Sequence, residues 1–152
     1  MAERQLVVFG IADEEFGVDI IQVQEIVRLQ EITKVPNAPA FVEGIINLRG
    51  RVIPLVDLRK RFNFSQKEHD DDSRIIVTTI EENLIGIIVD SVAEVLRIEE
   101  EAIEPAPPIV AGVGREYLEG VGKIDNRLIV LLELEQILSS AEKEAVAAVD
   151  PS

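Results

Sequence analysis

The feature of this sequence that most constrains its fold is an internal duplication. The segment VQEIVR at residues 23–28 matches VAEVLR at residues 92–97, with Val, Glu and Arg identical. FVEGIINL at residues 41–48 likewise matches YLEGVGKI at residues 117–124. The offsets are 69 and 76 residues, and the slip between them falls in the Pro/Gly-rich stretch PAPPIVAGVGRE, where an insertion costs little. A match in the same order with one gap indicates two copies of one structural unit.

Each copy predicts the same order of elements: a strand pair with a short polar link, a third strand, a Pro-containing loop, a hairpin and a helix. The hairpin turns are Arg49-Gly50 in copy one and Asp125-Asn126 in copy two. Gly and Asn tolerate a positive φ, so these paired positions demand the same turn geometry. The opening strand pairs are predicted at residues 6–11 and 15–18, and at 74–80 and 84–89. The closing helices are predicted at residues 58–63 and 134–146.

Five short strands per copy predict a mainly all-β fold of two small five-stranded barrels side by side, with short helices and a C-terminal helix. The chain is 47% apolar but only 4% aromatic, so Val, Ile and Leu must build the core, which favours strands. Its 152 residues suit one domain with two lobes. Lobe one is predicted at about 5–64 and lobe two at about 74–146, joined by an acidic tether at 65–73, and strand exchange between the lobes is left open. Pro54, inside a predicted strand, is expected on an edge or at a bulge.

Charge and composition exclude several classes of partner. The formal net charge of −14 repels nucleic-acid phosphate and anionic lipid. The absence of cysteine excludes disulfides and thiol chemistry and fits a reducing compartment. No apolar run approaches the ~20 residues that span a bilayer, and the N-terminus lacks the pattern of a signal peptide. The sequence predicts a cytoplasmic protein that neither binds nucleic acid nor inserts into the membrane.

Catalytic patterns are missing from the sequence. His69 is the only histidine and lies in the tether, so no Ser-His pair can be built on a rigid scaffold. A metal site of His69 with Asp70 to Asp72 is disfavoured, because adjacent side chains cannot easily converge on one ion and no second ligand cluster is visible. No metal and no cofactor is therefore predicted. A small enzyme that uses clustered carboxylates stays open as the alternative, because acidic residues are numerous.

The remaining class is a protein-binding module, and Arg49 is its first candidate residue. Its counterpart in copy two is Asp125, so this turn does not require a cation. The other interpretation of Arg49 is an exposed turn residue without function. Glu25 recurs as Glu94, which indicates a role in the fold of both copies, although either one could also face a partner.

Four segments carry a resemblance to a known family: FGVDIIQVQEIV, VPNAPAFVEGIINLRGRVIPLVDLRKRF, IGIIVDSVAEVLRIEEEAIEPAP and YLEGVGKIDNRLIVLLELEQIL. They resemble the CheW family of bacterial chemotaxis coupling proteins, over roughly residues 5 to 141. NLRG followed by VIPLVDL, with VQEI upstream, is that family's signature. The resemblance implies two SH3-like barrels around a shared hydrophobic core. It also implies an adaptor without catalytic activity, which joins methyl-accepting chemoreceptors to the histidine kinase CheA at receptor arrays on the inner face of the membrane.

The same resemblance implies where the partners bind. The receptor's helical hairpin tip would dock in a groove between the lobes, and the regulatory domain of CheA would make barrel-to-barrel contacts, for which Gly44 is a candidate. Val23 and Val92 are expected to be at least partly exposed at that groove. The fold also occurs as a regulatory module of CheA and CheV, but without a kinase core or a receiver domain this chain is predicted to be a free-standing adaptor. The full set of candidate partner-binding residues is Val23, Glu25, Gly44, Arg49, Ile75, Gly86 and Val92.

Overall fold

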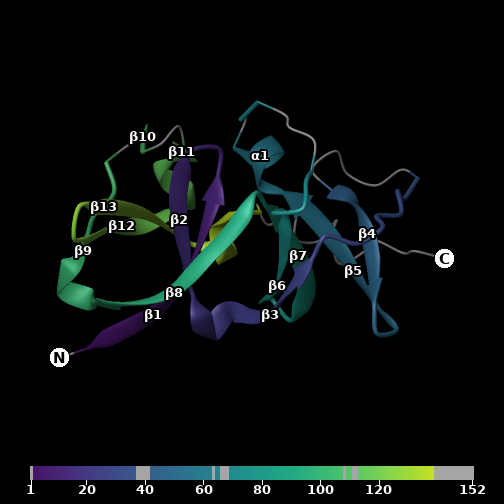
Figure 1. Ribbon diagram of the computed structural model, residues 1–152, viewed down its shortest axis with the longest axis horizontal. Helices are drawn as coiled ribbons and strands as arrows, with labels where there is room; N and C mark the ends of the chain where they lie inside the picture. The colour runs from purple at the N-terminus through teal and green to yellow at the C-terminus, as the bar shows by residue number, and fades with distance from the viewer. Residues whose placement is uncertain are drawn as a thin grey trace.

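A computed structural model describes residues 2–36, 42–62, 64–65, 69–107, 109–110 and 113–138. Its strands form two main sheets that lie side by side (Figure 1). The sheet on the right of Figure 1 has the order β3-β6-β7-β5-β4 and is called barrel one here, and the sheet on the left has the order β8-β1-β2-β13-β12-β9 and is called barrel two. This mainly β architecture confirms the fold class predicted from the duplication.

The strands of barrel one are β3 (Val23–Arg28), β4 (Val42–Leu48), β5 (Arg51–Asp57), β6 (Arg74–Ile80) and β7 (Asn83–Val89). The strands of barrel two are β1 (Glu3–Ile11), β2 (Glu14–Asp19), β8 (Ser91–Glu99), β9 (Ile103–Glu104), β12 (Leu118–Ile124) and β13 (Arg127–Leu132). A separate two-stranded sheet joins β10 (Ile109–Val110) and β11 (Val113–Gly114). The helical turns are α1 (Leu58–Arg61) and the 3₁₀ turns η1 (Ile20–Gln22), η2 (Glu100–Ala102), η3 (Arg115–Tyr117) and η4 (Leu134–Gln136).

Each barrel takes its strands from both copies of the repeat. The opening hairpin of copy one, β1–β2, pairs with β8 and β13 of copy two. The opening hairpin of copy two, β6–β7, pairs with β3 and β5 of copy one. The contiguous blocks 5–64 and 74–146 therefore each contribute to both sheets. Because every barrel needs strands from both blocks, neither block carries the strands of a whole barrel.

Both sheets close in the same way. After β3, Thr33 exchanges two backbone hydrogen bonds with Ile45 of β4, at N–O distances of 2.9 and 2.8 Å. After β8, the short strand β9 pairs with β12. The chain that leaves β3 thus returns to β4, and the chain that leaves β8 returns to β12, which closes each sheet into a barrel.

The positive φ expected at the second turn residue is confirmed at Gly50 but is wrong for Asn126, and the left-handed position that both turns share is the first one. Arg49 has φ of 52° and Asp125 has φ of 54°, so the first turn residue is left-handed in both copies. Gly50 is also left-handed, with φ of 83°. The first central residue of the tight turns that suit hairpins needs a positive φ. Asp adopts this conformation more readily than Arg, so copy one places a less suitable residue at this turn.

Pro54 lies in the interior of barrel one's sheet, neither on an edge strand nor at a bulge, so the expectation for it was wrong. It faces Ile45 on β4. The N–H and C=O of Ile45 both bond to Thr33 instead, so Pro54 occupies a position from which β4 requires no hydrogen bond. On the other side, the parallel pairing of β5 with β7 begins only at Leu55. The missing N–H of proline therefore removes no ladder bond.

Three apolar clusters form the core. One fills barrel one around Leu55 and Ile75, and a second fills barrel two around Leu6 and Ile129. The third and largest cluster takes residues from both barrels, including Phe16 of β2 and Ile87 of β7. It is the shared core that joins the barrels. Ring contacts extend through it, since Phe9 stacks on Phe16, Phe16 on Phe62, and Phe62 contacts Phe64 and Tyr117.

The helices are shorter than predicted where they are described. The first is the single turn α1, capped by the Asp57 side chain, which accepts a hydrogen bond from Arg59 N at 2.9 Å. The described residues end at 138 with η4, whose Leu134 packs into the shared core. The remainder of the helix predicted at 134–146 lies outside the described residues. No helix in the described part of the chain is long and apolar enough to cross a membrane.

Candidate partner-binding surface

The sequence-predicted residues Arg49 and Glu25 meet at the surface of barrel one. Arg49 stands on the β4–β5 turn with 68% of its side chain exposed, and its Nη2 forms an ion pair with Oε1 of Glu25 on β3. Barrel closure brings these two elements together, because Thr33 links the end of the β3 segment to β4. The pair fixes the tip of the hairpin against β3 while most of the guanidinium faces solvent.

The equivalent glutamate in barrel two is also paired with an arginine, but this arginine lies in a strand and not in the hairpin turn. Glu94 accepts a hydrogen bond from Nη1 of Arg127 at 3.1 Å. Arg127 opens β13 and also bonds Glu15 on β2 through Nε at 3.1 Å. The hydrogen bonds from Arg127 lower the pKa of Glu15 below its usual range. The recurring glutamate thus serves the fold in both copies, whereas only copy one supplies its arginine from the turn.

Apolar side chains lie exposed at matching positions of the two barrels. Ile26, next to Glu25 on β3, is 38% exposed, and Val52, just after the Arg49 turn, is 41% exposed. Their repeat counterparts Val95 and Leu128 are each 50% exposed. Equivalent exposure at both offsets shows that the two copies present these apolar side chains in the same way, although single exposed apolar side chains are common on protein surfaces. These four residues are not among the candidates predicted from the sequence, although their recurrence at both offsets is a signal that could have identified them.

One exposed apolar residue has no apolar counterpart. Ile21, in the η1 turn that joins the two barrels, is 83% exposed. Its place in copy two is taken by Asp90, which is bonded on several sides. Ile21 is therefore a further surface residue that the sequence analysis did not single out.

Val23 and Val92 are half-buried and pack against the shared core. Val23 opens β3 and Val92 lies near the start of β8, each just before the residue at which its strand pairing shifts register. Both residues are thus part of the junction between the barrels and only partly open to solvent.

Gly44, Ile75 and Gly86 are buried and offer no side-chain surface to a partner in this structure. A Cβ at Gly86 would lie 2.5 Å from Leu55 Cδ2 and 2.8 Å from Ile75 Cγ2, where β7 runs beside β5. A Cβ at Gly44 would lie 2.7 Å from the backbone oxygen of Thr33, at the closure of barrel one. These three positions keep barrel one closed, so any influence on binding would pass through the shape of the barrel.

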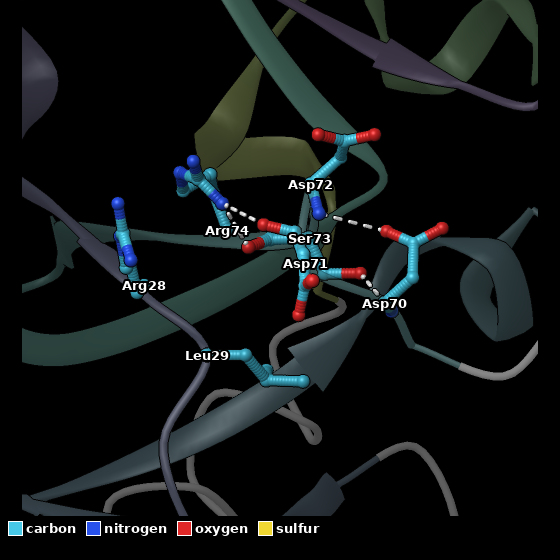
Figure 2. A pocket seen from close by; sticks show the side chains of 7 residues that line it. All are labelled: Arg28, Leu29, Asp70, Asp71, Asp72, Ser73 and Arg74. Carbon is cyan, nitrogen blue, oxygen red and sulfur yellow. Dashed lines mark hydrogen bonds between the residues drawn. The ribbon is translucent and has the colours of Figure 1, made fainter.

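A hollow of about 570 Å³ lies elsewhere, at the start of β6 (Figure 2). Arg74 donates through Nη1 to the backbone oxygens of Asp71 and Ser73 at 2.7 and 2.8 Å, which folds the end of the tether into a turn (Figure 2). Arg28 and Asp72 also line it, so charges of both signs face the hollow. It shares no residue with the surface around Arg49.

Comparisons with known proteins converge on one family. The model of the CheW-like domain matches residues 5–142. Chemotaxis protein CheW of Klebsiella aerogenes is 36% identical over 143 residues, which cover 94% of this chain and 86% of the relative. Probable chemotaxis protein CheW of Rhizobium etli is 38% identical over 143 residues, which cover 94% and 92%. The crystal structure of the scaffolding protein TtCheW from Thermoanaerobacter tengcongensis superimposes with a TM-score of 0.84 at 42% identity, over 91% of this chain and 90% of that one.

Proposed function

Because this chain belongs to the CheW-like family of chemotaxis scaffold proteins, we propose that it is a non-enzymatic adaptor that couples methyl-accepting chemoreceptors to the histidine kinase CheA. The observation that carries this proposal is the surface around Arg49. A largely exposed arginine stands on a turn whose backbone favours other residues. The same barrel exposes two apolar side chains, Ile26 of β3 and Val52 of β5. Arginine is enriched among the residues that dominate binding energy in protein interfaces.

The duplication supports an adaptor with two different partners. Barrel one and barrel two present apolar residues at matching places, but the turn beside them carries Arg49 in one and Asp125 in the other. Two related surfaces whose turns carry opposite charges can select two different proteins, because like charges across an interface disfavour the wrong partner. We assign the surface around Arg49 to one partner and leave barrel two available to the other. The receptor tip and the regulatory domain of CheA are the expected pair.

The ionisable groups favour a scaffold over an enzyme. Arg4 is paired with Asp19 and Glu119, Arg59 with Asp90, and Arg127 with Glu15 and Glu94. Each of these arginines joins segments that are distant in the sequence, which is the pattern of structural ion pairs. We propose that the protein acts at receptor arrays on the inner face of the membrane by binding the receptors and without crossing the bilayer itself.

Reconstitution with a receptor tip and CheA tests the proposed function. Kinase activity should respond to receptor state only when this chain is present, and the chain should be recovered with each partner separately in a pull-down. If receptor control of the kinase persists without it, the adaptor function is wrong. If the chain alone turns over a substrate through its carboxylates, the enzyme alternative is correct instead.

A further inference from the structure

Three metal-ligating side chains from separate segments converge beside α1. Glu43 of β4, Asp57 at the end of β5 and His69 of the tether each place one ligand atom within 4.8 Å of the other two. The tether histidine thus meets acidic groups that lie more than ten residues away from it in sequence. This supplies the second group of ligands that was not visible in the sequence around His69.

The fold explains the place of each of the two carboxylates. Register between β4 and β5 shifts between Val42 and Gly44, so Glu43 is the extra residue of a bulge. A bulge turns its side chain away from the regular alternation of the strand. Asp57 follows Val56, which is paired with Val42, so the end of β5 lies beside this bulge. Bulge and strand end therefore present their carboxylates to the same space.

Asp57 is the unusual member of this cluster, because it is a carboxylate with only 4% exposure. Its Oδ1 accepts a hydrogen bond from Arg59 N at 2.9 Å. Within the described residues, no hydrogen bond reaches its Oδ2. Glu43 is partly neutralised by an ion pair with Lys60 through Oε1. Burial raises the pKa of Asp57, in keeping with a carboxylate that lacks sufficient compensation for its lost water.

We propose that Glu43, Asp57 and His69 form a binding site for a divalent transition-metal ion, with Zn²⁺ as the best fit. Imidazole nitrogen and carboxylate oxygen are both ligands of Zn²⁺, whereas Mg²⁺ and Ca²⁺ select sites made of oxygen alone. The bound ion would compensate the buried charge of Asp57. It would also fasten the tether to the end of β5, and so fix the segment that leads into β6.

Calorimetric titration of the metal-free full chain with ZnCl₂, at physiological ionic strength and with excess Mg²⁺ present, tests this site. One Zn²⁺ should bind per chain, and His69→Asn should weaken binding by at least about tenfold, since changes around metal ligands typically cost 10–100-fold. Asp72→Asn is the matched control for the tether, and Glu119→Gln is the control for the bulge, because Glu119 is the repeat counterpart of Glu43 and is held by Arg4. Neither control should change the affinity for Zn²⁺.

A second measurement locates the ion on the histidine. His69 is the only histidine in the chain, so its ring signals in a nuclear magnetic resonance spectrum can be assigned directly. One equivalent of Zn²⁺ should shift them, and the same amount of Mg²⁺ should not. The proposal is overturned if Zn²⁺ leaves the ring signals unchanged, or if Asp72→Asn weakens binding as much as His69→Asn, which would show diffuse attraction to an acidic surface.

Discussion

Barrel one and barrel two each pair the recurring glutamate with an arginine, but the two arginines lie at different positions of the hairpin. In barrel two, Arg127 lies in a strand between Glu94 and Glu15, and the turn before it is left to Asp125. In barrel one, Glu25 is reached from the turn itself by Arg49, which remains mostly in solvent. The comparison shows that the recurring glutamate belongs to the fold, while the position of its arginine is free to vary. In barrel one the arginine, Arg49, lies on the exposed turn and presents its positive charge to solvent.

The largest expected effect is on partner binding by Arg49→Asp, which gives the turn of barrel one the residue found in barrel two. Loss of a desolvated interface arginine costs on the order of 2–5 kcal/mol of binding free energy, and the reversed charge adds repulsion. Stability should change by no more than about 0.5–1 kcal/mol, because the lost ion pair is exposed and Asp suits a left-handed turn. Melting curves and affinities for the receptor tip and the CheA regulatory domain check this.

Arg51→Asp is the matched control, because Arg51 is exposed two residues away on the same hairpin. It makes the same change of charge and should affect binding less. If Arg49→Asp folds and binds both partners normally, Arg49 is only a turn residue. If it unfolds, the pair with Glu25 is structural, as the pair of Arg127 and Glu94 is.

The next effect concerns repeat counterparts with opposite environments, Asp90 and Ile21. Asp90 accepts from Arg59 Nε at 2.9 Å and from Ala12 N at 2.8 Å, and so links α1 to the β1–β2 turn. Hydrogen bonds to charged groups contribute about 1.5–3 kcal/mol each, so Asp90→Ala should lower the free energy of unfolding by about that amount or more. Ile21→Ala, at an exposed side chain, should stay within about 0.5 kcal/mol. Urea denaturation of both variants measures the contrast, and equal losses would contradict it.

A third comparison uses the glycines at the parallel contacts, Gly86 in barrel one and Gly17 in barrel two. The added Cβ of Gly86→Ala would lie 2.5 Å from the nearest side-chain atom, against 3.1 Å for Gly17→Ala. Overpacking of a core costs about 1–3 kcal/mol, so Gly86→Ala should lie in that range and Gly17→Ala below it. Chemical denaturation with receptor binding measured in parallel would also show whether the shape of barrel one affects binding. A larger loss at Gly17 would contradict the packing difference.

The smallest effect is the dependence of stability on pH in Arg127→Gln. Arg127 holds the pKa of Glu15 below its usual range, so this pair stabilises the folded state above the unfolded pKa of Glu15, and the contribution is lost as pH falls through the lowered folded value. The variant should be less stable than the parent at neutral pH, and the difference should shrink in acid. Melting temperatures across the acidic range check this. A difference that stays constant with pH would show that Glu15 does not titrate with the pair.

Much of the fold could be predicted from the sequence, because its signals are local or repeat along the chain. The match of residues 23–28 to 92–97 predicted the duplication, and alternating aliphatic runs predicted the strands. Family membership followed from the signature around NLRG and is confirmed by the comparisons. Arg49 could be singled out because the repeat offers Asp125 as its counterpart. Each of these features, a strand with one buried face, a turn or a short motif, is specified by residues that are close together in the chain.

Only the tertiary structure decided which distant segments meet. Alternation along a strand tells which side is buried but not which strand lies beside it, so the exchange of β1–β2 and β6–β7 between barrels could not be derived. Those neighbouring strands determine that Arg49 pairs with Glu25 and that Ile75 is buried. They also determine that Pro54 lies where no ladder hydrogen bond is needed. The sequence by itself determined two copies of a β-unit and their family. Barrel closure determined the surface, because contacts between residues far apart in sequence are fixed only when the strands pair.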